Sequence, residues 1–245
     1  MTPEPPFAEP LSRAPRAVPA KHALEWFAEA MRLWKRGPWP FSAIALAVLV
    51  VSVVFSPVPV AGFVAVYVIA PLLAAGLLYA SLAADRGDRP RVAHLLAVFA
   101  APWRAQLAVV AAGFAVGAAE NLAAWYFANV NLLLPLEDAA DIPAAAIVAI
   151  YVTGVLASLP VTFVPMAALF DGESIRRAFS LSARAFAMNV PAFALLAGIS
   201  IMMLLIGLAT NGIGLILALP WLAAASYAAW KDIFGLRSDG ALMSR

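Results

Sequence analysis

Long stretches without an ionisable side chain constrain the fold of this chain more than any other feature. One runs from Ala185 to Trp230, 46 residues, and another covers Val58 to Ala84. A helix needs about 20 apolar residues to cross the hydrocarbon core of a bilayer, so each run is long enough for a crossing. Charged residues make up only 12% of the chain, about half the share of a soluble domain. A soluble fold could not hide so much apolar surface, and the sequence predicts an integral membrane protein.

Six segments of the chain can form membrane-spanning helices. They are residues 39–55, 58–84, 105–127, a part of 142–170, 189–210 and 213–233. The last two come from the run Ala185–Trp230, which the turn-forming sequence at 211–214 divides. Barrel strands alternate in polarity and these segments do not, so the expected fold class is all-α, a polytopic transmembrane bundle of six helices. Four prolines inside the segments are expected to kink these helices: Pro71, Pro160, Pro165 and Pro220.

The distribution of Lys and Arg predicts the orientation of the bundle. All sixteen lie before the first segment, between the second and third, between the fourth and fifth, or at the end of the sixth and beyond it. The other connections contain none, and one of them carries Glu137, Asp138 and Asp141 instead. Basic residues accumulate on the cytoplasmic side of bacterial membrane proteins. We therefore expect a multi-pass protein of the bacterial inner membrane with both termini in the cytoplasm. The net charge of +2 then reflects topology, and nucleic acid is not expected as a partner.

Shorter stretches between the membrane segments have one apolar and one polar helical face. The clearest are Lys21–Arg36 and Gly172–Asn189, and a weaker one covers Arg91–Phe99. This pattern is typical of helices that lie in the membrane plane, so we expect cytoplasmic amphipathic elbow helices here. Two basic clusters on the elbows are candidate contacts for lipid headgroups: Arg86, Arg89 and Arg91 in one, and Arg176, Arg177 and Arg184 in the other.

The expected domain organisation centres on a membrane domain over residues 37–235. An interfacial helix at 21–36 precedes it, residues 1–20 form a disordered proline-rich tail, and residues 236–245 form a polar tail. A shift of 85 residues places Gly87 on Gly172 and Asp88 on Glu173, within units that share one topology. The match predicts a parallel repeat of residues 58–128 and 142–210.

Three passages carry a resemblance to a known group of proteins. They are AAGLLYASLAADRGDRPRVAHLLAVF at 74–99, ALFDGESIRRAFSLSARAFAMN at 168–189 and YAAWKDIFG at 227–235. Together they resemble an uncharacterised family of proteobacterial integral membrane proteins. That family is distantly similar to the membrane domain attached to some bacterial glycerophosphodiester phosphodiesterases. The resemblance implies membrane helices joined by surface elbows, and it assigns no activity and no functional residue.

Catalytic signatures are missing from the sequence. It has no H-E-x-x-H, G-x-S-x-G or Walker-type motif, and it has no cysteine. We therefore expect no enzymatic activity, no cofactor and no metal site. His22 and His94 fall in cytoplasmic surface segments, where we expect them to be solvated or to face headgroups.

Glu120 is the one ionisable residue in the interior of a predicted span, and Asn121 follows it. An ionisable side chain within the membrane is a candidate functional residue, so the two form a candidate intramembrane polar site. Glu120 should lie about 6 Å beyond the midplane, toward the outside and away from every basic residue. We expect it to face the bundle interior and to bond hydroxyl, amide or backbone groups, or water. Gly113 and Gly117, two turns and one turn earlier, are expected to pack closely against a neighbouring helix.

Three functions remain open at this point. The preferred one is a structural, assembly or lipid-contacting membrane protein, whose partners are membrane lipids and either another protein or further copies of the chain. The alternative is a small transporter or channel with Glu120 lining the path, and a lipid enzyme ranks third. Five polar residues discriminate between the first two: Thr153, Ser158, Thr162, Ser200 and Asn211. Their convergence with Glu120 on one cavity would favour transport, and their scatter would count against it.

Overall fold

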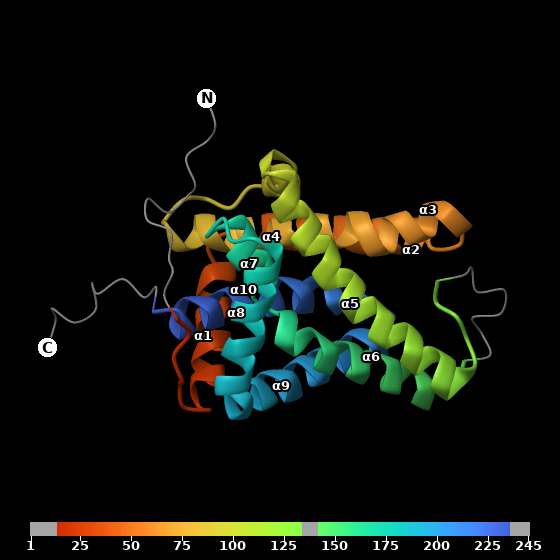
Figure 1. The fold of residues 1–245 in the computed structure, drawn as a ribbon. Helices are drawn as coiled ribbons and strands as arrows, with labels where there is room; N and C mark the ends of the chain where they lie inside the picture. The colour runs from red at the N-terminus through yellow and green to blue at the C-terminus, as the bar shows by residue number, and fades with distance from the viewer. Residues whose placement is uncertain (1–13, 134–141, 236–245) are drawn as a thin grey trace, which may run out of the picture.

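The computed structural model describes residues 14–133 and 142–235, and every regular element in them is helical (Figure 1). The α-helices are α1 (His22–Trp34), α2 (Pro38–Phe55), α3 (Pro59–Val64), α4 (Ala70–Asp85), α5 (Trp103–Ala128), α6 (Ala144–Ser158), α7 (Val164–Leu169), α8 (Ile175–Met188), α9 (Val190–Ala209) and α10 (Leu215–Ile233). A π-helix, η1 (Ala65–Ile69), and two 3₁₀-helices, η2 (Val92–Ala100) and η4 (Leu159–Val161), connect some of them. The all-α class is confirmed. The acidic loop with Glu137, Asp138 and Asp141 lies outside the described residues.

Five helical stretches within the described residues are long and apolar enough to cross a membrane. They are Pro38–Phe55, Val60–Asp85, Trp103–Ala128, Ala144–Leu169 and Val190–Ala209. The chain is thus a multi-pass membrane protein, as the uncharged runs predict. The expected sixth span, α10, is not among the five. Its last turn contains Lys231 and Asp232, which make it more polar than the others.

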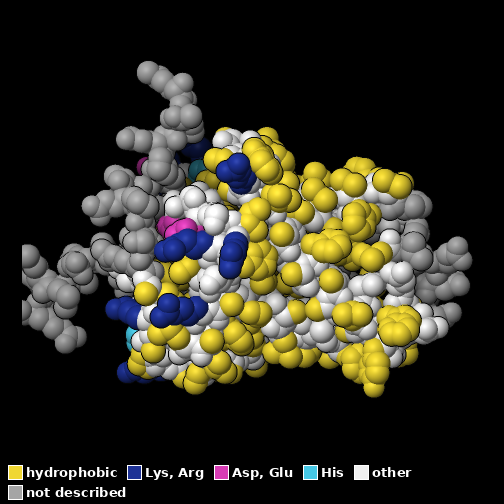
Figure 2. Space-filling view, viewed as in Figure 1, with side chains coloured by type: hydrophobic (Ala, Val, Ile, Leu, Met, Phe, Trp, Pro, Cys, Tyr) yellow, Lys and Arg dark blue, Asp and Glu magenta, His cyan; other side chains and the backbone are white. Residues whose placement is uncertain are grey.

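The long helices share one general direction, and two shorter helices cross them at one end. Figure 1 shows α2, α4, α9 and α10 running along the bundle, with α5 inclined across it. Helices α1 and α8 stand crosswise to them at the end where α4 and α10 finish. Dark blue Lys and Arg side chains gather at the same end, while most of the remaining face is apolar (Figure 2). We call this the charged end.

Two carboxylates hold the helices together at the charged end. Asp232 of α10 is only 1% exposed, and it hydrogen-bonds Arg16 at 2.9 Å, His22 at 2.7 Å and Trp26 at 3.0 Å. Asp85 at the end of α4 accepts hydrogen bonds from two residues of α10, Lys231 at 2.5 Å and Tyr227 at 3.0 Å.

His22 and part of the N-terminal tail differ from the expectation. A buried carboxylate needs donors around it, and the contact with Asp232 takes His22 out of the solvated role expected for it. Residues 14–20 were expected in a disordered tail, yet the amide of Arg16 donates to Ile233 at 2.9 Å. The amide of Val18 donates to Asn189 at 2.7 Å, and the Asn189 amide group donates to the Arg16 carbonyl at 3.0 Å. The two ends of the described chain therefore meet at the charged end.

The internal prolines fall at changes of helix type, except for one. Pro71 follows the π-helix η1, Pro160 lies in η4, and Pro165 lies in the first turn of α7. Proline lacks an amide hydrogen, so the turn before it loses one α-helical bond and can adopt another geometry. Pro220 lies inside the continuous helix α10.

The two elbows share a turn but differ in the helix that follows it. Gly87 and Gly172, the aligned glycines, both have positive φ, +89° and +68°. After each glycine the acidic residue's amide bonds back to the preceding helix: Asp88 to Ala83 at 2.9 Å and Glu173 to Ala167 at 3.0 Å. The first elbow then forms the 9-residue 3₁₀-helix η2, whereas the second forms the 14-residue α8. The parallel repeat remains a prediction that this turn supports.

Candidate functional site

Helix α5 carries Glu120 and approaches its neighbours through small residues. A Cβ atom added to Gly113 would lie 2.8 Å from Cγ of Pro71, and one on Gly117 would lie 2.3 Å from Cε1 of Tyr67. Such separations are shorter than van der Waals contact, so only glycine permits this distance between α5 and the η1–α4 segment. The two glycines therefore pack against Pro71 and Tyr67 and set the position of α5.

Glu120 lies flat against α6 because residue 154 is also a glycine. A Cβ atom on Gly154 would come within 2.0 Å of Oε1 of Glu120. The carboxylate borders a cavity of about 310 Å³ between α5, α6, α9 and α10. Five hydroxyl side chains line the same space: Tyr151, Ser158, Thr162, Ser200 and Ser226. We call this space the Glu120 cavity.

Three of the five discriminating residues converge with Glu120. Ser158, Thr162 and Ser200 line the Glu120 cavity, whereas Thr153 and Asn211 do not. Sequence reasoning missed Tyr151 and Ser226. Both lie on helices whose apolar character gives no sign of which face turns inward, so only the packing of α6 and α10 reveals them.

Three of the five hydroxyl groups in the cavity donate their hydrogen to a backbone carbonyl, which leaves their oxygens as acceptors. Ser158 donates to the Val155 carbonyl at 2.7 Å, Thr162 to the Ser158 carbonyl at 2.9 Å, and Ser200 to the Leu196 carbonyl at 2.8 Å. A hydroxyl has one hydrogen to donate and two lone pairs. Because the hydrogen is bonded within the helix, each oxygen can offer lone pairs to a cation or to another donor.

Among the described residues, no Arg, Lys or His forms an ion pair with Glu120. Helix α5 begins at the charged end, and Glu120 lies 17 residues further on, about 25 Å along the helix. An ionised carboxylate in surroundings of low dielectric constant is costly unless a counter-charge is near. A carboxylate at this position is therefore suited to bind a proton or a small cation.

A second space, the inner cavity, adjoins the Glu120 cavity on the side of the charged end. It measures about 280 Å³ and shares Val116, Ser158, Thr162 and Ser226 with the Glu120 cavity. Pro71 of α4 and Pro165 of α7 also line it. The two cavities therefore share a polar wall formed by Ser158, Thr162 and Ser226, and the remaining lining of the inner cavity is apolar.

Asn121 does not belong to this region, although it was grouped with Glu120 in the candidate site. Its side-chain oxygen accepts a hydrogen bond from the Leu132 amide at 2.7 Å, and it does not line the Glu120 cavity. Successive helical residues point about 100° apart, which is enough to separate the two side chains. Asn121 thus holds the chain after α5, where Asn129 adopts a left-handed conformation with φ 54°.

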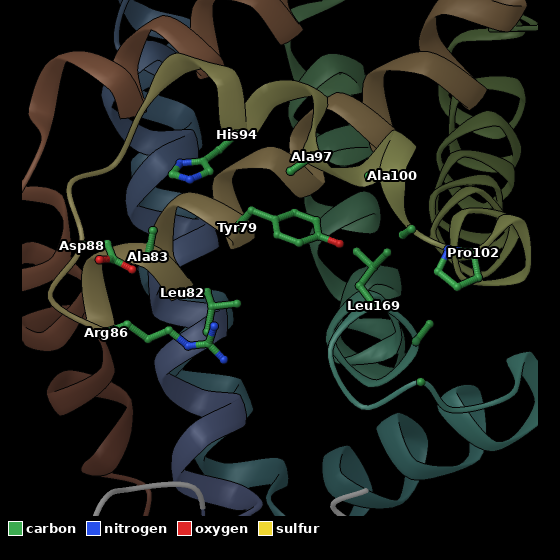
Figure 3. A pocket seen from close by; sticks show the side chains of 13 residues that line it. Tyr79, Leu82, Ala83, Arg86, Asp88, His94, Ala97, Ala100, Pro102 and Leu169 are labelled. Carbon is green, nitrogen blue, oxygen red and sulfur yellow. The ribbon is translucent and has the colours of Figure 1, made fainter. Parts of the chain in front are cut away.

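All six arginines of the basic clusters are exposed, and one of them, Arg86, also borders a pocket. Arg86 lines a pocket at the charged end together with Asp88 and His94 (Figure 3). Arg89 and Arg91 are exposed, as are the three arginines of the second cluster, Arg176, Arg177 and Arg184. Arg177 pairs with Glu173 on the same helix at 2.9 Å.

His94 is half-buried rather than solvated, and its hydrogen bonding sets its tautomer. The Arg91 amide donates to Nδ1 of His94 at 3.1 Å, so in the neutral ring the hydrogen resides on Nε2. Burial and the Arg91 charge hold the pKa of His94 below its ordinary value, against the opposing effect of Asp88. The ring is therefore a neutral donor through Nε2.

The described residues contain no group of three or more His, Cys, Asp or Glu side chains that could hold a metal ion. Comparisons of the chain with protein-family models, curated proteins and solved structures found no match. The functional argument therefore rests on the cavities themselves.

Proposed function

We propose that this protein is a small six-span transporter of the bacterial inner membrane that binds a cation, the proton included, at Glu120. One observation carries the proposal: a carboxylate and five hydroxyl side chains converge on one cavity within a bundle of apolar helices. Polar groups inside a membrane protein are costly and mark ion or substrate pathways. The convergence favours transport over the structural role preferred from the sequence.

The chemistry of the cavity favours a cation over an anion. The carboxylate is negative when ionised, and the hydroxyl groups of Ser158, Thr162 and Ser200 direct their lone pairs away from their own helices. Oxygen-only surroundings of this kind suit a proton or a hard cation such as sodium or potassium. The inner cavity borders the same Ser158, Thr162 and Ser226 on the side of the charged end, and its other lining residues are apolar.

The proposed topology keeps α10 as the sixth span. The hydrogen bonds of Arg16 with Asp232 and Ile233 bring the N-terminal segment and the end of α10 to one end of the bundle. An even number of crossings is needed for this. In this arrangement the charged end faces the cytoplasm, and α1 and α8 lie along that membrane surface as interfacial elbows. The proposal includes no catalytic step.

Ion flux into proteoliposomes tests the proposal. Purified protein is reconstituted with a trapped pH-sensitive dye, or with sodium- or potassium-sensitive dyes, and the ion gradient is imposed across the membrane. We expect faster entry of one of these three cations than into protein-free liposomes. Glu120→Gln should abolish the excess flux while the melting temperature changes little, because the amide keeps the shape and loses the charge.

Two matched comparisons separate the Glu120 cavity from general damage. Gly154→Ala keeps the carboxylate but displaces it, since the added Cβ would occupy the place of Oε1, so flux should fall as in Glu120→Gln. Thr162→Val removes a cavity hydroxyl, and Thr153→Val removes a similar one that bonds Ala149 outside the cavity. Only the first should reduce flux. Wild-type flux no greater than that of empty liposomes for all three ions, or unchanged flux in Glu120→Gln, would contradict the proposal.

A further inference from the structure

A larger pocket opens at the charged end, separate from the Glu120 cavity. It measures about 610 Å³ and has three walls: the last two turns of α4, the elbow η2, and the turn at Gly172 that follows α7 (Figure 3). We call it the elbow pocket. Residues of α4 from Pro71 to Leu78 line the inner cavity, and those from Tyr79 to Arg86 line the elbow pocket, so the two follow one another along α4.

The walls of the elbow pocket divide into an apolar and a polar part. Leu82, Leu169, Ala97 and Pro102 make up much of the apolar part. The polar part lies toward the turn after α4, where Arg86 and Asp88 flank Gly87. The positive φ of Gly87 reverses the chain at this point, so that a cationic and an anionic residue two positions apart border the same pocket.

The depth of the pocket matches an amphiphile in the cytoplasmic leaflet. Arg86 follows directly after the apolar stretch that ends at Asp85, so it lies where a span leaves the hydrocarbon. Tyr79 lies seven residues back, about 10 Å deeper along α4. The elbow pocket thus reaches from the headgroup level into the hydrocarbon, with its charges at the outer end.

We propose that the elbow pocket binds one phospholipid with a primary-amine headgroup, of the phosphatidylethanolamine class. The Arg86 guanidinium binds the headgroup phosphate, and Nε2–H of His94 is a second donor. The Asp88 carboxylate binds the ammonium group, and the apolar wall with Leu82 and Leu169 covers the start of an acyl chain. A zwitterionic headgroup fits because the pocket carries both signs of charge, whereas a purely anionic headgroup would meet Asp88.

Native mass spectrometry of the full-length protein tests this binding. The detergent-purified, delipidated protein is mixed with dioleoyl lipids that carry ethanolamine, choline or glycerol headgroups. We expect one tightly retained ethanolamine lipid, with an affinity at least about fivefold above the other two. A quaternary choline cannot donate hydrogen bonds to Asp88, and a glycerol headgroup lacks the cation. Arg86→Ala should weaken all three lipids by about tenfold or more, since a charged hydrogen bond to phosphate is lost.

Three further variants make the test specific. Asp88→Asn should remove the preference for ethanolamine over glycerol headgroups and leave overall lipid binding. Arg176→Ala is the matched control, because Arg176 is exposed on the other elbow and does not line the pocket. It should leave all affinities unchanged. Ala97→Phe narrows the apolar part without touching a charge and should also weaken binding, which keeps the test valid even where Arg86→Ala does not fold.

Three outcomes would overturn the proposal. Equal retention of the three lipids by the wild type would show that no headgroup is selected. A loss in Arg176→Ala as large as that in Arg86→Ala would show attraction to the charged surface in general. Displacement of the lipid by millimolar inorganic phosphate would show that the pocket takes free phosphate. None of these lipid-binding results depends on ion flux through the Glu120 cavity, so the two proposals are tested separately.

Discussion

Three carboxylates near the charged end show how a buried acidic group is accommodated in this protein. Asp232 and Asp85 are surrounded by donors from other helices. Asp171 follows α7 and differs from both, because its Oδ1 atom is buried and has no hydrogen-bond partner among the described residues. Burial, and then the charge of Glu173, raise the pKa of Asp171 to about 7.

The raised pKa predicts that Asp171 destabilises the protein at high pH. The folded protein retains the proton on Asp171 up to pH 7, whereas the unfolded chain releases it near pH 4. Stability should therefore fall as pH rises from 4 to 7 and stay low above that. Asp171→Asn should raise the free energy of unfolding at pH 8 by about 1–2 kcal/mol and should have little effect at pH 4.5. The value allows for the partial exposure of the Asp171 side chain, because solvent screens its charge.

Thermal unfolding in detergent at both pH values measures this difference. Asp88→Asn is the control, because Asp88 is exposed at the aligned turn of the first elbow and should show no pH-dependent gain. The interpretation fails when the melting temperatures of Asp171→Asn and the wild type differ by the same amount at pH 4.5 and pH 8.

At the scale of elements, glycines determine where helices touch and where they face lipid. Gly117 of α5 and Gly154 of α6 each leave room for a side chain of a neighbouring helix, Tyr67 and Glu120 respectively. Gly198 of α9 is exposed, and no atom lies within 4 Å of the position that its Cβ would take. Glycine therefore permits close helix contact at positions 117 and 154, whereas at position 198 it has no neighbour to accommodate.

Alanine substitutions at two glycines should change stability in opposite directions. Gly117→Ala forces a Cβ atom to 2.3 Å from the Tyr67 ring, so α5 or the ring must move, at a cost of about 1–3 kcal/mol. Gly198→Ala meets nothing and improves helix propensity, so it should be neutral or stabilising by up to about 1 kcal/mol. Melting temperatures of the two variants in one detergent provide the comparison. A loss in Gly198→Ala equal to that in Gly117→Ala would contradict the packing described for α5.

At the scale of the whole molecule, the charged end, the elbow pocket and the two interior cavities follow one another along the bundle. The contacts of Asp85 and Asp232 bring α1, α4 and α10 together at the charged end, where the elbow pocket lies. From there the inner cavity and the Glu120 cavity follow along the inside of the bundle. The protein thus has a charged surface on one side, and its only intramembrane carboxylate among the described residues lies nearer the other side.

The proposed topology makes a direct prediction for reporter fusions. A fluorescent protein fused after Arg245 should fluoresce and alkaline phosphatase fused there should be inactive, because both reporters would be cytoplasmic. Phosphatase fused after Asp138 should be active, because this loop should face outward. Activity of the phosphatase at Arg245 would show that α10 does not cross the membrane or that the bundle is inverted.

The sequence alone determined the membrane class, the positions of the long helices and the charged end. These features depend on the hydropathy and charge of consecutive residues, which tertiary contacts hardly alter because a membrane span must be apolar along its whole length. The alignment of Gly87 with Gly172 was also visible, and both glycines adopt a positive φ in the structure. The helix type of the elbows was not, and α8 and η2 differ despite their aligned turns.

Only the tertiary structure decided which side chains meet. Glu120 was recognisable by its charge, but its separation from Asn121 and its contact with Gly154 depend on the rotation of α5 against α6. The inward positions of Tyr151 and Ser226 and the pairing of His22 with Asp232 likewise depend on which helices are neighbours. The sequence of a span that is apolar on every face does not show which face turns toward the neighbouring helices. That rotation is set by close contacts such as Gly117 with Tyr67, and these exist only once the bundle is assembled.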